Sequence, residues 1–437
     1  MQTRLLIPVN KTKTRLKIRL KHHSSQRNKV LTRFIGYTTK QLPQKLLEFI
    51  RVVLEDKPYD RKTIVDLIPL FEMNILNVDS ETAQLFFVCI YTLVMKKEIS
   101  KIISYSELLI LMNTIMHQQV FQIYSLLICE IIYQLLNYNP LLVKFYQNCE
   151  YRHNLEILLS HILTGPEYQE RQKLLPLKIH KKLIESDYYF KIMLFKSQNI
   201  YLLIDTINRY DDPLITQECC YIFRSLSAES NLKDLILASD SCLTFIFKCL
   251  SVKSKSISLC ILSVIQNLSD RIVKFIPCQT VECLLEILVF KYSLIFSRTS
   301  CVQDKLFRII LKYIVSSISN IIADQDDFKI YLLENGFLKS VLKTFIELIE
   351  IDNSDQRQSE SDLGVYEILL RFLRNMFNIN NIQVHTNGEL TKNQVLVVEV
   401  MQKFLELKSN NFPNNDQIDM SWIGFCQILN KTSMFKV

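Results

Sequence analysis

Histidine and cysteine are the residues that most often do chemistry, and their spacing here matches no catalytic or metal-binding pattern. The twelve cysteines include no Cys-x-x-Cys pair, and several lie inside apolar runs such as residues 219–223. Buried thiols explain that placement better than a zinc or disulfide framework. No His-x-x-x-His pair, a common helical spacing of two metal ligands, occurs among the histidines at 22, 23, 117, 153, 161, 180 and 385. The sequence therefore predicts no metal site.

Glycine is scarce, with only six in 437 residues. Phosphate-binding loops and tight hairpins depend on glycine for positive φ angles, so the chain has little material for them. The sequence contains neither a Gly-x-Ser-x-Gly nucleophile motif nor a Walker motif. We therefore expect no enzymatic activity and no cofactor.

From about residue 41 onward, apolar residues recur every three or four positions, which is typical of amphipathic helices. One phrase repeats at residues 224–227, 266–269 and 319–322: an apolar helix reaches a Ser or Asn, then an aliphatic residue, then a turn. Weaker copies lie near Leu93, Leu136, Ile184, Met376 and Leu429. Four of the seven intervals fall near the ~40–47 residues of armadillo or HEAT units. Longer intervals contain polar insertions, at 297–304 and at 352–362, which we expect to form loops.

These repeats predict an all-α fold, a right-handed α-solenoid of armadillo/HEAT-like repeats. Residues 41–437 would supply about eight repeats. A single helical unit cannot bury its apolar face alone, and stacked units leave a long concave surface. Such a surface suits extended peptides or helices of partner proteins.

The positive charge is concentrated at the start of the chain. Residues 1–40 hold eleven Lys or Arg and no acidic residue, whereas the remaining chain holds 41 basic and 44 acidic residues. Residues 15–21 alternate basic and mostly aliphatic side chains, which suits an extended chain. Besides a solvated tail, this arm could dock on an acidic protein, act as a transit peptide, or bind RNA or anionic lipid. Its candidate binding residues are Arg15, Lys17, Arg19, Lys21, Arg27 and Lys29.

The best repeats resemble those of importin α. Residues 219–228, Cys-Cys-Tyr-Ile-Phe-Arg-Ser-Leu-Ser-Ala, are similar to that family's third-helix phrase, in which an Asn follows a Trp by four residues. Residues 316–322 match the Asn half, and residues 330–338 resemble the next repeat's opening, where Gly336 would end a short helix. The basic arm resembles the family's segment for importin β, although it lacks a run of consecutive arginines.

The resemblance implies which residues would line a cargo groove. Aligned with the family, the Trp positions become Tyr133, Tyr221, Ser263, Ser316 and Arg371, and the Asn positions become Asn137, Ser225, Asn267, Asn320 and Asn375. The groove candidates are therefore Tyr133, Asn137, Tyr221, Asn267, Asn320 and Asn375. A tyrosine can stack against a cation, whereas Arg371 would repel one. Alternatively, Asn267, Asn320 and Asn375 end helices or bond to neighbouring backbone.

Two functions follow from these patterns. The first is an importin-α-type adaptor that carries protein cargo into the nucleus and engages a β-type carrier through its arm. The alternative is an armadillo scaffold in a cytoskeletal or organellar assembly. The slightly acidic body argues against nucleic acid, and no segment is long and apolar enough for a membrane span. We expect a cytoplasmic and nuclear location, or an organellar one if the arm is a transit peptide.

Overall fold

The computed structural model describes residues 5–6, 17–18, 80–95, 108–109, 112, 121–196, 199–209, 212–296, 305–354, 360–378, 387–411 and 416–431. The chain divides into two compact units, residues 1–222 and 223–437, and each is described by itself below. The boundary predicted at residue 40 and the insertion at 297–304 lie outside the described residues.

Two short strands lie in the predicted arm. Strand β1 (Leu5–Leu6) pairs antiparallel with β2 (Lys17–Ile18), with Leu5 opposite Ile18. The extended conformation expected from the alternating pattern of residues 15–21 is therefore present where the structure describes that segment.

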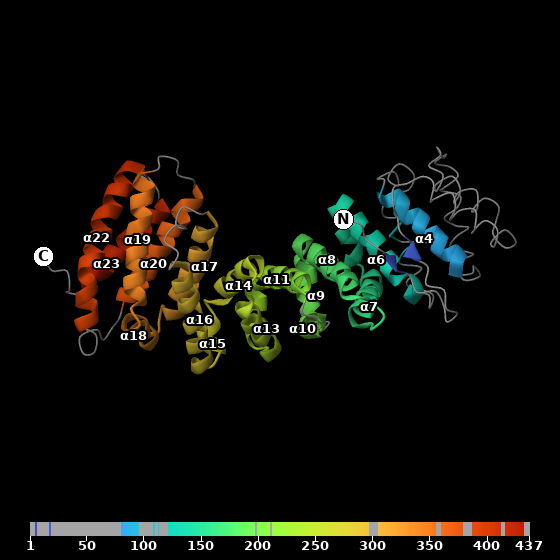
Figure 1. The fold of residues 1–437 in the computed structure, drawn as a ribbon, viewed down its shortest axis with the longest axis horizontal. Helices are drawn as coiled ribbons and strands as arrows, with labels where there is room; N and C mark the ends of the chain where they lie inside the picture. Colours follow the sequence, from blue (N-terminus) through green and yellow to red (C-terminus); the bar gives the residue numbers. More distant parts are fainter. Residues whose placement is uncertain are drawn as a thin grey trace. The chain divides into compact units, whose positions relative to one another are not determined.

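The described helices of the first unit pack on helices that are close to them in sequence. α4 packs against α6, α6 packs against α8, and α7 contacts both α6 and α8 (Figure 1). A 3-10 helix, η2, precedes α7, so η2, α7 and α8 form one short-long-long triplet. The helices are α4 (Ser80–Met95), α6 (Phe121–Tyr138), η2 (Pro140–Gln147), α7 (Cys149–Thr164), α8 (Glu170–Ser186), α9 (Tyr188–Lys196), α10 (Asn199–Arg209) and α11 (Pro213–Ser227), which continues into the second unit.

The second unit repeats this triplet three times. Each triplet has a short first helix and two longer ones: α12 (Ser230–Leu237), α13 (Asp240–Ser251) and α14 (Lys255–Leu268); α15 (Ile272–Phe275), α16 (Cys278–Phe296) and α17 (Lys305–Ile322); α18 (Asp326–Glu334), α19 (Phe337–Ser354) and α20 (Glu360–Phe377). The last pair is α22 (Asn387–Asn411) and α23 (Asp416–Lys431). The third helices α14, α17, α20 and α23 stack in order, and α19 packs on α22 (Figure 1).

Gly336 ends α18 as the sequence predicted. Its φ angle is +68°, and its amide N–H donates to the Leu333 carbonyl at 3.0 Å. A left-handed residue here lets the chain reverse into α19 at once, and glycine adopts that conformation without a Cβ penalty.

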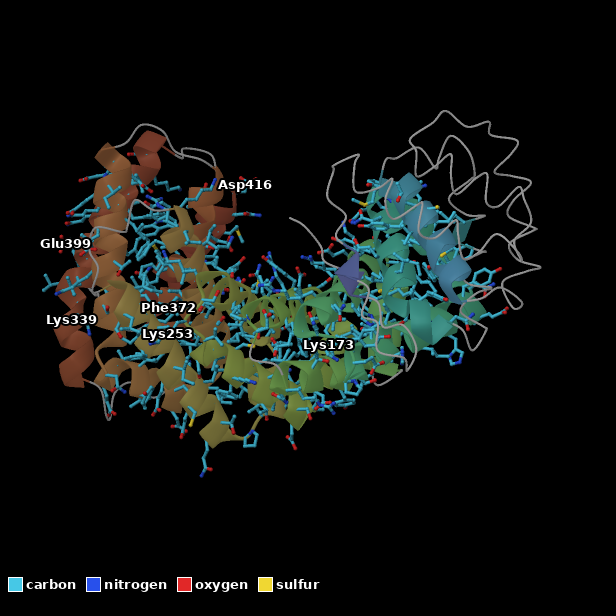
Figure 2. The ribbon with its side chains drawn as sticks, turned by 45° about the vertical axis from the view of Figure 1, so that its right-hand side comes forward. Lys173, Lys253, Lys339, Phe372, Glu399 and Asp416 are labelled. Carbon is cyan, nitrogen blue, oxygen red and sulfur yellow. The ribbon has the colours of Figure 1, made fainter. Side chains whose placement is uncertain are left out.

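Apolar side chains fill the space between the helix layers. In α20 the side chains of Phe372 and Leu373 are fully buried, and Figure 2 shows Phe372 among the packed helices of its unit. The described cysteines are free thiols, and most of them are buried, as their apolar surroundings predicted.

Buried polar groups tie helices together in both units. Lys173 is fully buried, and its ammonium donates to the carbonyls of Ile162, Leu163 and Gly165 at 3.2, 2.7 and 2.9 Å. These carbonyls lie at the C-terminal end of α7, where backbone acceptors lack helical partners. Lys173 on α8 therefore caps α7.

The prediction that residues 352–362 form a loop is wrong at both ends. α19 continues to Ser354 and α20 begins at Glu360. Asp352 is buried because Arg308 on α17 pairs with it through both terminal nitrogens, one of them at 2.9 Å. The Tyr366 hydroxyl of α20 donates to the same carboxylate at 2.5 Å. A polar residue was thus drawn into the core by partners on two other helices.

Candidate protein-binding face

The groove candidates lie on the third helices of the repeats. We call the solvent-accessible sides of these helices the third-helix face, described separately for the two units. In the first unit it includes Tyr133 and Asn137 on α6, Lys178 and Lys181 on α8, and Glu218 and Tyr221 on α11. In the second unit it includes Asn267 on α14, Lys312 and Asn320 on α17, and Glu367, Arg371, Arg374 and Asn375 on α20; Ser316 on α17 lies buried beneath Arg371.

The two candidate groove tyrosines of the first unit, Tyr133 and Tyr221, already lie close to lysines of the same chain. The Lys181 ammonium lies 3.9 Å from the centre of the Tyr221 ring, and the Lys178 ammonium lies 6.0 Å from that of Tyr133. Lys181 also pairs with Glu218 at 3.3 Å. Because cation–π attraction acts within about 6 Å, α8 supplies to both rings the kind of group that a basic cargo would bring.

A half-buried carboxylate, that of Glu130, lies three residues before Tyr133 on α6. Burial raises the pKa of Glu130, and a hydrogen bond from Gln134 at 3.0 Å and the charge of Lys178 partly offset that rise. Burial, with the nearby Glu130 charge, raises the pKa of Tyr91 to about 12. Charges on α6 and α8 therefore already influence one another beside Tyr133.

The asparagines of the second unit bridge successive third helices. The Asn267 side-chain amide donates to the Ser227 hydroxyl at 3.0 Å, and Asn320 donates to the Ser269 hydroxyl at 2.9 Å. Asn375 donates to the carbonyl and hydroxyl of Ser319 at 2.9 and 3.1 Å. Each amide N–H is therefore directed to the preceding repeat. Backbone carbonyls, the partners named in the alternative reading of these asparagines, accept from Asn267 (Arg224, 3.4 Å) and Asn375 (Ser319), whereas the acceptor of Asn320 is a serine hydroxyl.

In the second unit, Arg371 occupies one of the positions that align with a tryptophan of importin α. Arg371 donates to the hydroxyl of Ser316 at 2.9 Å. Ser316 also aligns with a tryptophan of importin α, so the residues at two successive Trp positions are hydrogen-bonded to each other. Lys312 and Arg374, which the sequence reasoning missed, lie on the same face. The signal that could have found them is Gly364 and Gly424 inside helices, because a glycine there leaves room for a long neighbouring side chain.

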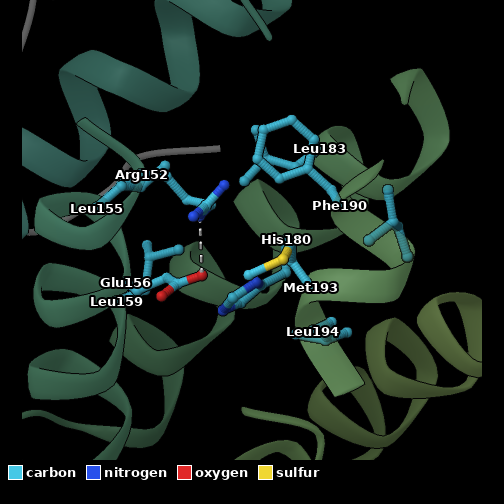
Figure 3. Close-up of a pocket in the computed structure, with 10 residues that line it drawn as sticks. Arg152, Leu155, Glu156, Leu159, His180, Leu183, Phe190, Met193 and Leu194 are labelled. Atoms are coloured by element: carbon cyan, nitrogen blue, oxygen red, sulfur yellow. Dashed lines mark ion pairs between the residues drawn. The ribbon is translucent and has the colours of Figure 1, made fainter. Parts of the chain in front are cut away.

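A hollow between α7, α8 and α9 is the pocket drawn in Figure 3. Arg152 and Glu156 form an ion pair there at 3.9 Å, and apolar side chains such as Phe190 and Met193 line the rest. Burial lowers the pKa of His180 to about 4, so its imidazole is neutral at pH 7. The lining residues include no activated nucleophile, and the pocket has the character of a packing gap.

The sequence also predicted no metal site, no membrane span and a set of binding residues in the N-terminal arm. No group of three His, Cys, Asp or Glu side chains among the described residues could hold a metal ion. Within the same residues, no helix is long and apolar enough to cross a membrane. Lys17 lies in β2, whereas Arg15, Arg19, Lys21, Arg27 and Lys29 lie outside the described residues.

Comparison with known proteins finds similar solved structures but no sequence relative. No protein-family model and no curated protein matches the chain. Among solved structures, it is similar to a designed armadillo repeat protein in complex with the peptide (KR)4, at 14% identity over 62% of this chain and 98% of that one, with a TM-score of 0.42. A second designed armadillo repeat protein matches at 14% identity, with the same coverage and a TM-score of 0.44.

A third solved chain matches over most of the length. It comes from work described as "A conserved phosphorylation switch controls the interaction between cadherin and beta-catenin in vitro and in vivo". The likeness covers 93% of this chain and 70% of that one at 12% identity, with a TM-score of 0.66. At this identity the likeness shows the fold alone. The chain has the all-α, armadillo-like solenoid fold, and the sequence-based prediction of fold class is confirmed.

Proposed function

We propose that this protein is a non-enzymatic scaffold that binds a segment of a partner protein along its third-helix face. The supporting observation is the ordered stack of α14, α17 and α20, whose half-buried polar side chains line one side of the second unit. Stacked repeats use such surfaces to bind extended segments. The interaction between cadherin and beta-catenin named for the third solved structure is a protein–protein interaction and agrees with this role.

Site-specific photo-crosslinking tests the proposal. A photoreactive amino acid is placed on the third-helix face, at Glu367 or at the half-buried Tyr313, which lies two turns before Asn320 on the same side of α17. The exposed Lys339 and Lys343 on α19 are the matched control positions. We expect a defined set of proteins to crosslink from the first two positions and not from the controls. Equal crosslinking from both sides, or none from the third-helix face, would refute the proposal.

The second candidate is the importin-α-type adaptor for nuclear import. The basic arm and the resemblance of residues 219–228 and 316–322 to importin α support it. Lysines at both tyrosines and Arg371 at a third aromatic position disfavour a basic cargo. We therefore rank this function second. Residence in the cytoplasm and nucleus belongs to it, and an organellar location would follow if the arm is a transit peptide.

Binding to a β-type importin tests this candidate. The full chain is compared with a variant in which Arg15, Lys17, Arg19 and Lys21 are replaced by Gln. An adaptor of this type should bind the carrier, and the variant should lose that binding. Binding that survives the four substitutions would remove the arm from the mechanism, and a fluorescent fusion would report the location independently.

A further inference from the structure

We propose that Lys312, Arg371 and Arg374 form an anion-binding row on the third-helix face of the second unit, and that it selects an Asp- or Glu-rich segment of a partner protein. The inference rests on the proposed scaffold function and names the chemistry of its partner. It reverses the charge preference that the resemblance to importin α implies.

Two glycines let the outer cations of the row lie across the next third helix. A Cβ atom at Gly364 on α20 would lie 3.0 Å from the Lys312 ammonium, which comes from α17. A Cβ atom at Gly424 on α23 would lie 3.2 Å from Cδ and 3.4 Å from Nη1 of Arg374. Both side chains therefore rest on helix surface where other residues would crowd them. The row thus extends from α17 across α20 to α23.

The three cations are half-buried, and no carboxylate among the described residues forms an ion pair with any of them. Arg371 donates one hydrogen bond to Ser316, and its buried Nε has no hydrogen-bond partner. Several other shielded cations do have carboxylates: Lys233 pairs with Asp270 at 2.9 Å and Lys329 with Asp326 at 2.8 Å. Partly desolvated charges without counter-ions are unfavourable, and an anionic guest would offset that cost.

Charge on this surface favours an acidic guest. Glu360 and Glu367 are the acidic residues on the same side of α20, eleven and four residues before Arg371, so three cations share this surface with two acids. Arg371 and Arg374 are three residues apart on one helix, where like charges repel. A guest carboxylate between them would relieve this repulsion and could accept two parallel hydrogen bonds from a guanidinium.

The spacing of the row suits an extended segment. Neighbouring packed helices lie about 8–10 Å apart, and an extended chain advances about 3.3 Å per residue. A guest therefore crosses one third helix roughly every three residues and needs about nine residues to cross α17, α20 and α23. A folded partner domain is not required.

The test measures binding of the full chain to labelled peptides of about 12 residues, long enough to cross the row. Alternating Glu-Ser, Lys-Ser and Gln-Ser peptides serve as acidic, basic and neutral probes, and fluorescence anisotropy gives the dissociation constants. The test variant carries Lys312→Gln, Arg371→Gln and Arg374→Gln. The control carries Lys253→Gln, Lys339→Gln and Lys343→Gln, which remove the same charge from exposed positions of the same unit; Lys253 and Lys339 are labelled in Figure 2.

We expect the acidic peptide to bind most tightly and the test variant to lose about tenfold in affinity, since each charge-assisted contact contributes roughly a factor of two to three. The control should change by less than about twofold. Because both variants keep the basic arm, their difference isolates the row from nonspecific attraction to residues 1–40. Circular dichroism verifies folding. Should the triple variant misfold, Lys312→Gln alone should weaken binding about two- to threefold, whereas Lys253→Gln alone should leave it unchanged.

Equal losses in the test and control variants would overturn the proposal, as would tighter binding of the basic or neutral peptide. Binding of a single-stranded RNA through these cations, without binding of the acidic peptide, would overturn it in favour of nucleic acid. In each case, crosslinking from Tyr313 decides separately whether the scaffold function stands. If Tyr313 captures a partner, only the acidic chemistry is wrong.

Discussion

Breaking the buried ion pair between Arg308 and Asp352 should destabilise the second unit far more than breaking an exposed pair. The two side chains are only 10% and 5% exposed, and the Tyr366 hydroxyl donates to the same carboxylate. Asp352→Ala removes the carboxylate that both terminal nitrogens of Arg308 contact, and Arg308→Met removes the guanidinium from the buried Asp352. Each substitution should cost about 3–5 kcal/mol.

The double variant Arg308→Met/Asp352→Leu is the decisive comparison. It removes both charges together, and Tyr366 retains the Leu348 carbonyl at 3.3 Å as an acceptor. Replacing a buried pair by apolar residues of similar size is often close to neutral. We therefore expect the double variant to be more stable than either single variant, with a coupling of about 3 kcal/mol or more.

Hydrogen exchange on the full chain is the suitable assay, because large proteins open in parts. A loss of about 4 kcal/mol raises the population of the open state roughly a thousandfold, and amide hydrogens in α17, α19 and α20 should exchange faster by the same factor. Exchange in α7 and α8 serves as the internal reference. Lys403→Met, which breaks the Lys403–Glu350 pair with side chains 30% and 55% exposed, is the matched control and should cost less than about 1 kcal/mol. Additive single effects, or single variants no worse than this control, would refute the reasoning.

Three further substitutions have defined outcomes. Lys173→Met removes the ammonium that donates to three buried carbonyls at the end of α7. The substitution should cost roughly 1–3 kcal/mol of stability and speed hydrogen exchange in α7. Unchanged exchange in α7 would contradict the capping role. Gly336→Ala places a Cβ at φ +68° and should cost about 1 kcal/mol in thermal unfolding, with Gly336→Asn costing less because Asn tolerates this conformation. Burial lowers the pKa of His180 to about 4 from an ordinary value near 6.5, so the unfolded state binds more protons between these pH values. Stability should therefore fall by about 3 kcal/mol as the pH drops from 6.5 to 4. His180→Phe should remove that part of the pH dependence, whereas substitution of the exposed His153 should not.

The candidate site was only partly accessible from the sequence. The spacing of the repeats located Asn267, Asn320 and Asn375 on corresponding helices, and the structure places them there. What each amide bonds to depends on the register between adjacent helices, which the sequence alone does not set. The hydroxyls of Ser227 and Ser269 became partners only when successive repeats stacked.

The sequence by itself determined the fold class, because the helical period of apolar residues and the scarcity of glycine leave stacked helices as the way to bury the apolar faces. It also determined local features such as the turn at Gly336, where a single backbone conformation selects the residue type. Only the tertiary structure decided which charges are paired. Lys181 and Tyr221, for example, are 40 positions apart in the chain. Whether their side chains come into contact depends on how α8 and α11 are rotated relative to each other. The chemistry of the third-helix face is therefore a property of the packing between repeats.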